Sequence, residues 1–193
     1  MQKPKIAFYK HDLGQAELEE IARVLQGVIL TTGDRVAEFE EQFAEYLGCR
    51  HAVGVTSWTG GAHIALLGLG IGPGDEVITT PLTFIATATA ILQAGAKPVF
   101  VDVEPTTGNI DVNLIAAAIT PRTKAILPVH LYGLMCDMVA LRHFADRYGL
   151  TIIEDAAHCV EGSREGIRPG QVSEAAVFSF FATKSLACGE GGL

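Results

Sequence analysis

The pattern of hydrophobic and polar positions changes near residue 50. Between residues 33 and 48, apolar side chains recur at helical spacing, and Gly48 is a suitable helix stop. This spacing predicts an amphipathic helix over 33–48, with a further helix before it. We therefore expect an N-terminal helical segment over residues 1–50 that packs on the rest of the chain. The apolar positions of the predicted helix face are Val36, Phe39, Phe43, Tyr46 and Leu47.

After residue 50, short apolar runs alternate with helical stretches. The runs, predicted as strands, are 51–56, 76–80, 97–102, 124–130, 151–155 and 175–181. The stretches between them, predicted as helices, are 60–70, 85–95, 112–119 and 138–149. Strands that alternate with helices form a mainly parallel sheet with helices on both faces. The pattern predicts one doubly wound α/β domain over residues 51–193.

Ligands of such sheets bind beyond the carboxyl ends of the strands, so the residues that follow each strand are the candidate site. Polar and aromatic side chains occur at several of these positions. They are Ser57, Thr59, Gly60, Thr83, Phe84, His130, Asp155 and His158.

Composition excludes several classes of function. The 193 residues carry a net charge of −8 without a basic cluster, which argues against nucleic-acid binding. No apolar run is long enough to span a membrane, and the first residues lack the apolar core of a signal peptide. The four cysteines form no CxxC pair, so we expect neither a metal site nor a disulfide framework, and a cytoplasmic location.

The stretch TSWTGG, residues 56–61, lies between a predicted strand and a predicted helix. Backbone amides at such a helix N-terminus can hold a phosphate, and a Ser/Thr helix cap explains the same residues equally simply. The glycines of GLGIGPGD, residues 68–75, resemble a dinucleotide loop but follow a helix and precede a strand. They indicate a helix end and a turn instead.

The stretch TIIEDAAHCV, residues 151–160, ends an apolar strand with Glu154 and Asp155. A buried carboxylate at this position requires a partner. Asp155 is either the N-cap of a short helix over 156–160 or a buried anion that faces a cationic group of a ligand. His158 would lie near the same face of that helix, although a lone histidine is more often a structural residue.

Lys184 follows an aromatic strand and precedes a glycine-rich turn in FSFFATKSLACGEGGL, residues 178–193. It is either a surface charge or a desolvated amine with a lowered pKa that can act as a nucleophile. A phosphate cradle, a buried acid, an aromatic ring and such a lysine together match pyridoxal 5′-phosphate, which requires a Schiff-base lysine and an acidic partner for its ring nitrogen.

Six segments, at 30–48, 70–92, 95–111, 117–133, 152–159 and 178–192, resemble the DegT/DnrJ/EryC1/StrS family of sugar aminotransferases. The resemblance implies the large domain of the aspartate-aminotransferase fold, which is PLP fold type I. It also implies a chain truncated relative to the family, with an incomplete large domain over 51–193 and without the C-terminal small domain.

The resemblance implies a role for each matching residue. Lys184 would form the Schiff base with pyridoxal 5′-phosphate, and Asp155 would pair with the pyridine nitrogen. Phe84 would stack on the ring, and His158 would lie against it. The phosphate would be held by Thr59, Gly60 and Ser179. Trp58 and Phe181 depart from the family pattern, at the phosphate loop and near the substrate.

The activity implied by the resemblance is transamination of a nucleotide-linked keto-sugar, with L-glutamate as amino donor, for polysaccharide or secondary-metabolite biosynthesis. A homodimer is the expected assembly. Two alternatives stay open: a non-catalytic fragment that folds or dimerises without activity, and a pyridoxal-phosphate sugar dehydratase of the same family. In the dehydratase branch a histidine replaces the lysine, so Lys184 argues against it.

Overall fold

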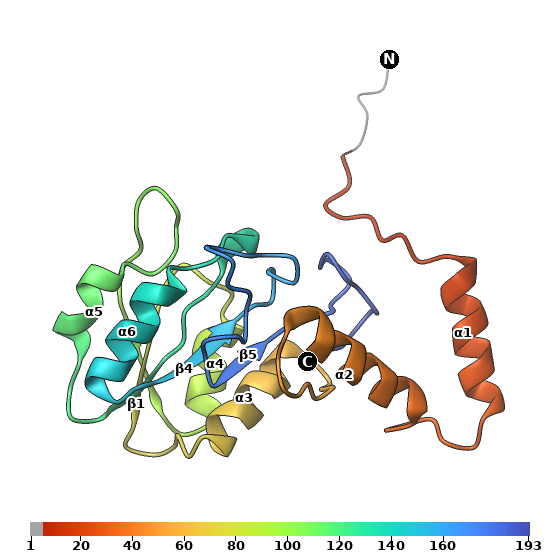
Figure 1. Cartoon of the computed structure of the whole chain (residues 1–193), viewed down its shortest axis with the longest axis horizontal. Coiled ribbons are helices and arrows are strands. Elements are labelled where there is room, and N and C mark those ends of the chain that lie inside the picture. The colour runs from red at the N-terminus through yellow and green to blue at the C-terminus, as the bar shows by residue number, and fades with distance from the viewer. Residues whose placement is uncertain (1–5) are drawn as a thin grey trace.

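The computed structural model describes residues 6–193, and residues 1–5 of the expected segment 1–50 lie outside this range. The sheet has five parallel strands in the order β2-β1-β3-β4-β5. Figure 1 shows the sheet among its covering helices. The strands are β1 (Glu76–Thr79), β2 (Lys97–Phe100), β3 (Thr123–Ile126), β4 (Thr151–Asp155) and β5 (Ala175–Val177). Because every connection between them crosses over through a helix or a long loop, all the strands end at the same edge of the sheet.

The helices lie on both faces of the sheet, as the alternating pattern predicted. One apolar cluster joins the sheet to α2 (Asp34–Leu47), α5 (Val112–Ala118) and α6 (Met138–Tyr148). A second cluster joins the opposite face to α3 (Trp58–Gly68) and α4 (Ala86–Gln93). Along β4, Ile152 belongs to the first cluster and Ile153 to the second, because successive side chains of a strand point to opposite faces.

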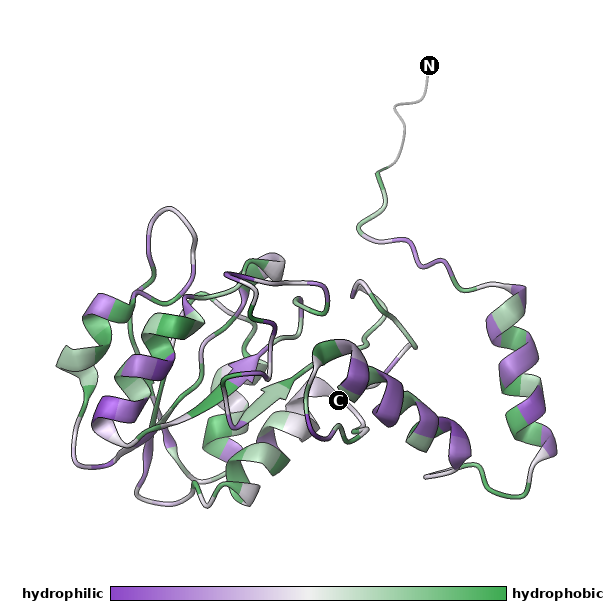
Figure 2. Ribbon diagram, in the orientation of Figure 1, coloured by the Kyte–Doolittle hydropathy of each residue, from purple (hydrophilic) through white to green (hydrophobic). Residues whose placement is uncertain are grey.

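The N-terminal helices differ in how they contact this body. Helix α2 ends at Gly48, which has a φ of 71°, and contributes the buried residues Phe43 and Leu47 to the core. Helix α1 (Gln15–Gln26) has no buried residue and stands away from the sheet in Figure 1. In Figure 2 both helices mix hydrophilic and hydrophobic residues, whereas α3 is predominantly hydrophobic.

Two predicted elements were wrong. The predicted strand over 51–56 contains one bridging residue, Val55, which pairs antiparallel with Gly192. A strand needs a run of successive pairs, and the described chain offers Val55 this single partner. The helix considered over 156–160 is a series of turns, because Asp155 Oδ1 accepts a hydrogen bond from the amide of Ala157, two residues on, as in an Asx turn.

The remaining predictions from the glycine patterns agree with the structure. Residues 68–75 form the end of α3 and a turn into β1, with Gly70 and Gly74 at φ values of 75° and 93°. Within residues 6–193, no helix combines the length and apolarity that crossing a membrane requires.

Candidate active site

Asp155 ends β4 and is 5% exposed. Its Oδ2 accepts a hydrogen bond of 2.8 Å from Thr87 Oγ1, and its Oδ1 accepts one of 3.2 Å from the amide of Ala157. Burial raises the pKa of Asp155 to about 6, although both hydrogen bonds act in the opposite direction. Within residues 6–193 no cation forms an ion pair with this carboxylate, so it can accept a cationic ligand group.

The backbone of Asp155 is fixed on both sides by the segment that follows β3. The Asp155 amide donates to the carbonyl of Pro128 over 2.8 Å, and the His130 amide donates to the carbonyl of Asp155 over 3.0 Å. These bonds extend the β3–β4 pairing beyond the regular strands, as the bridge between Val129 and Asp155 also indicates. The carboxylate therefore stands on a rigid part of the sheet edge.

Lys184 is half-buried, and its amide donates a hydrogen bond of 2.9 Å to the carbonyl of Phe181. Burial lowers the pKa of Lys184, and the charge of Asp155 acts in the opposite direction. The pKa of His158 is also lowered, first by burial and then by the charge of Lys184. Lys184 therefore lies within electrostatic reach of both Asp155 and His158.

Phe84 precedes α4 and is 78% exposed, so the face of its ring is free to contact a ligand. Hydrogen bonds connect the neighbour of Phe84 in the chain, Thr83, to Asp155. Thr83 Oγ1 lies 2.7 Å from Thr87 Oγ1, and Thr87 Oγ1 donates to Asp155. His158 stacks on Tyr132, with ring centroids 5.6 Å apart and planes within 7°. The ring of Phe84 thus lies just before the helix that bonds Asp155, and the ring of His158 lies just after the strand that ends with Asp155.

The predicted phosphate site lies at the N-terminus of α3. Ser57 is the N-cap, and its Oγ accepts a hydrogen bond of 3.1 Å from the amide of Gly60, so the helix-cap interpretation is confirmed. The cap and a phosphate site are compatible, because a helix N-terminus offers several free amides and a positive dipole end. Thr59, beside Gly60, is half-buried in the first turn.

Gly192 brings Ser179 to this helix N-terminus. Gly192 pairs antiparallel with Val55 on one side and with Ser179 on the other. A Cβ atom at Gly192 would lie 2.8 Å from the nitrogen of Trp58, so only glycine permits this approach. Trp58, which departs from the family pattern, does not fill the predicted phosphate loop over residues 56–61. Its side chain is 6% exposed and packs in the core under α3 and α4.

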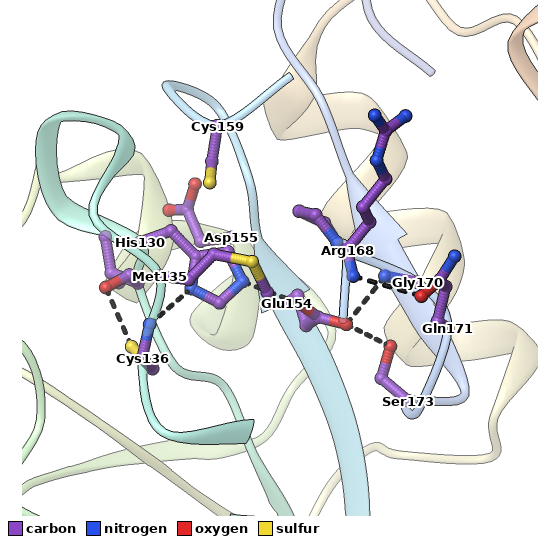
Figure 3. Close-up of polar contacts among 12 residues, drawn as sticks. His130, Met135, Cys136, Glu154, Asp155, Cys159, Arg168, Gly170, Gln171 and Ser173 are labelled. Carbon is purple, nitrogen blue, oxygen red and sulfur yellow. Dashed lines mark hydrogen bonds and ion pairs between the residues drawn. The ribbon is translucent and has the colours of Figure 1, made fainter. Parts of the chain in front are cut away.

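Two features of the site were missed by sequence reasoning. No role is predicted for Thr87 from the sequence, yet it is the hydrogen-bond donor to Asp155. A threonine on the buried side of an otherwise apolar helix was the available signal. Glu154 and His130 were noted separately, and their direct contact, shown in Figure 3, was not foreseen.

A cavity of about 1050 Å³ lies elsewhere, beside β5, and none of the predicted site residues lines it. Within the described residues, no three His, Cys, Asp or Glu side chains gather as metal ligands.

These residues fit pyridoxal 5′-phosphate. The buried Asp155 carboxylate has no cationic partner among residues 6–193, and a protonated pyridine nitrogen supplies one. The half-buried Lys184 has a lowered pKa suited to a reactive amine, and the N-terminus of α3 suits a phosphate. Fold and site together match the cofactor-binding domain of PLP-dependent α/β enzymes of fold type I.

Comparison with known proteins gives the family. Residues 11–193 match the DegT/DnrJ/EryC1/StrS aminotransferase family, and the chain belongs to it. Aminotransferases of this family depend on pyridoxal 5′-phosphate. The spore coat polysaccharide biosynthesis protein SpsC of Bacillus subtilis (strain 168) is 48% identical over 181 residues, which are 94% of this chain and 46% of SpsC.

Solved structures agree with this assignment. DesV of S. venezuelae, determined in complex with a ketimine intermediate, has 47% identity and a TM-score of 0.88, covering 92% of this chain and 48% of DesV. DesI, determined with its TDP-sugar product, has 39% identity and a TM-score of 0.91, covering 100% of this chain and 49% of DesI. The chain spans about half the length of these relatives.

Proposed function

We propose that this chain carries the cofactor-binding part of a sugar aminotransferase that moves an amino group from L-glutamate to a keto-sugar linked to a nucleotide. The observation that carries the proposal is the buried carboxylate of Asp155, which has no ion-pair partner in the described part of the chain and lies within electrostatic reach of the half-buried amine of Lys184. The TDP-sugar bound to DesI supports a nucleotide-linked substrate. The name of SpsC supports a role in polysaccharide biosynthesis.

When bound, pyridoxal 5′-phosphate supplies an aldehyde for an amine to attack and a pyridinium ring that takes up the electron pair left on the substrate carbon. Asp155 would hold the proton on the ring nitrogen, because a carboxylate beside a pyridinium favours its charged form. Lys184 Nζ would bind the aldehyde carbon and, once displaced by the amino donor, move the proton at the substrate carbon. Its lowered pKa leaves a larger share of the amine neutral and able to accept that proton.

The other predicted residues would orient the cofactor. Phe84 would cover one ring face, because its own ring is exposed beside α4. His158 would lie against the ring within reach of Lys184. Thr59, Gly60 and Ser179 would bind the phosphate at the N-terminus of α3, where the helix dipole favours an anion.

A homodimer is the proposed assembly. Helix α1 and the residues after it expose apolar side chains that the described chain leaves uncovered, and burial of such a patch against a second copy is favourable. The exposed residues are Leu18, Ile21, Leu25, Val28, Ile29 and Leu30. We propose the cytoplasm as the compartment, because the four cysteines are free.

The visible absorbance of the purified chain with added pyridoxal 5′-phosphate tests the proposal, followed by borohydride reduction and peptide mass spectrometry. We expect a yellow band and a reduced cofactor attached to Lys184. Lys184→Ala should lose both, and Lys124→Ala, at an exposed position of β3, should keep both. A folded chain that shows no band, or a label spread over the exposed lysines, would refute the assignment of Lys184.

A further inference from the structure

A second acidic residue, Glu154, lies beside Asp155 and is fully buried together with His130. Glu154 Oε2 lies 2.6 Å from His130 Nε2, as Figure 3 shows. Glu154 Oε1 accepts a hydrogen bond of 2.8 Å from the amide of Gly170 and another from Ser173 Oγ. The carboxylate therefore has three donors, which offset the cost of burying its charge.

The other ring nitrogen fixes the protonation of His130. The amide of Cys136 donates to His130 Nδ1 over 3.2 Å, so Nδ1 is an acceptor and carries no proton. The proton lies on Nε2 and is donated to Glu154. The geometry thus assigns a neutral imidazole held at both nitrogens, and an anionic Glu154.

Glu154 and Asp155 point to opposite faces of the sheet, because they are successive residues of β4. Glu154 points to the same face of the sheet as Ile152, where α2 and α6 pack. Asp155 points to the same face as Ile153, where α4 packs and Thr87 lies. The contacts of Glu154 are accordingly separate from those of Asp155. Glu154 can influence the candidate cofactor site only through the backbone.

His130 provides that backbone connection. Its amide bonds the carbonyl of Asp155 over 3.0 Å, while its ring bonds the side chain of Glu154. His130, in the segment that follows β3, is therefore bonded to two consecutive residues of β4, Glu154 and Asp155. Through Gly170 and Ser173, Glu154 also ties down the turn that leads into β5 and on toward Lys184.

We propose that the buried Glu154–His130 pair is a positioning device, which sets the place of the Asp155 carboxylate from the sheet face opposite to it. The role toward a cofactor rests on the proposed function. A buried carboxylate with a polar partner is rarely the most stabilising choice, since apolar residues of similar volume often stabilise a fold as well or better. Its advantage is a fixed geometry, which a carboxylate that faces a cofactor ring requires.

The test compares His130→Ala, which removes the ring but keeps the backbone amide and the charge of Glu154, with His130→Gln, which restores a side-chain N–H donor. Glu76→Gln is the matched control, because Glu76 is a buried, multiply bonded carboxylate at the opposite, amino-terminal end of the sheet. All variants are compared at a temperature where each is fully folded.

The first readout needs no cofactor: the titration of Asp155, followed by its ¹³C carboxyl resonance and assigned with Asp155→Asn. The polar and titratable groups near Asp155 are Thr87, Lys184 and His130, whose ring bonds Glu154 on the opposite face of the sheet. We expect His130→Ala to lower the Asp155 midpoint by about one pH unit, since a loosened strand end admits water. His130→Gln should recover most of the shift, and Glu76→Gln should show none.

The second readout is the affinity for pyridoxal 5′-phosphate, measured from the quenching of the single tryptophan, Trp58, at the N-terminus of α3. We expect about tenfold weaker binding for His130→Ala, recovered in His130→Gln and unchanged in Glu76→Gln. If His130→Ala does not fold, Glu154→Gln replaces it at unchanged volume, because a side-chain amide cannot accept from His130 at one end and from Gly170 and Ser173 at the other, as the carboxylate does.

An Asp155 midpoint in the broken-pair variant equal to that of the parent, with only stability reduced, would overturn the proposal and leave the pair a structural feature. Failure of the proposed function has a different signature, because the parent chain would then place no cofactor on Lys184. The Asp155 titration decides the positioning role in either case.

Discussion

Thr87 Oγ1 donates a hydrogen bond of 2.8 Å to Asp155 Oδ2, and both side chains are buried where α4 meets the end of β4. Thr83 Oγ1, 2.7 Å from Thr87 Oγ1, extends this contact toward Phe84. Asp155, which would face the cofactor nitrogen, is therefore oriented by α4, the helix that begins directly after the exposed ring of Phe84.

Removal of the Thr87 hydroxyl should raise the pKa of Asp155 further. Burial already raises this pKa to about 6, and the bond from Thr87 opposes that effect by stabilising the charged form. We expect Thr87→Val, which keeps the side-chain shape, to raise the midpoint by about one pH unit. Carboxyl NMR titration measures it, and Thr87→Ser, which returns the hydroxyl, should restore the parent value.

The same burial makes the stability of the cofactor-free chain depend on pH. The folded pKa of Asp155, about 6, exceeds its ordinary value of 3.8, so the folded state binds more protons between these values. Stability should therefore fall as the pH rises from about 4 to about 6, by up to about 3 kcal/mol. Urea unfolding of the parent and of Asp155→Asn at pH 4 and pH 7 checks this.

Asp155→Asn lacks the titrating group, so its unfolding free energy should change less over this range than that of the parent. Equal pH dependence in the two proteins would mean that Asp155 is solvated. Addition of pyridoxal 5′-phosphate should stabilise the parent more than the variant at pH 7, because the carboxylate of Asp155 forms an ion pair with the pyridinium and the neutral amide of the variant does not.

The sequence predicted the elements whose signal is local. The apolar positions of 33–48 identified α2, and within that face Phe43 and Leu47 are buried whereas Val36 and Tyr46 remain 39% and 46% exposed. The alternation of strands and helices predicted the parallel sheet, and the rule that ligands bind at the carboxyl ends of strands singled out Asp155 as a candidate. These features depend on spacing within one element or on the order of elements.

Features that depend on distant pairing were not predictable. Whether 51–56 forms a strand depends on Gly192, which lies far along the chain. The Glu154–His130 contact joins residues 24 positions apart, across β3 and β4. A threonine in a mostly apolar helix signals a polar partner, but only the fold identifies the partner of Thr87 as Asp155. Each required knowledge of which strand ends become neighbours.

The aromatic cluster that attaches α2 predicts a clear contrast between two phenylalanines. The ring of Phe43 lies 5.2 Å from that of Phe178 and 5.7 Å from that of Phe180, so Phe43→Ala should destabilise the chain by about 3–5 kcal/mol. Phe84 is 78% exposed, and Phe84→Ala should leave chemical denaturation nearly unchanged while weakening cofactor binding. A large stability loss in Phe84→Ala would show that its ring is packed rather than free.

Close packing of α3 on β5 predicts opposite effects of alanine at two glycines. A Cβ at Gly61 would lie 2.8 Å from Val177 Cγ1 and 3.0 Å from Val55 Cγ2, so Gly61→Ala should destabilise by about 1–3 kcal/mol. Gly68, in the same helix, has no atom within 4 Å of such a Cβ, and Gly68→Ala should stabilise by about 0.5 kcal/mol. Thermal unfolding of both variants distinguishes steric packing from helix propensity.

At the amino end of the sheet, Glu76 predicts acid sensitivity. Its carboxylate accepts hydrogen bonds from Thr120 Oγ1 at 2.6 Å and from Arg122 Nη2 at 2.9 Å, with Lys97 Nζ at 3.4 Å. The bond from Thr120 and then that from Arg122 lower the pKa of Glu76 from 4.5 to about 2. Its contribution to stability is therefore present above pH 4.5 and is lost as the pH falls toward 2.

Glu76→Gln should accordingly be less stable than the parent at pH 7, and the difference should shrink as the pH falls from about 4.5 to about 2. Acid titration followed by circular dichroism in dilute urea measures both midpoints. Glu41→Gln, which removes one negative charge from an exposed position of α2, controls for the change in net charge. A stability difference between Glu76→Gln and the parent that stays constant over this range would mean that protonation of Glu76 does not break the network, and that its three partners act through shape rather than charge.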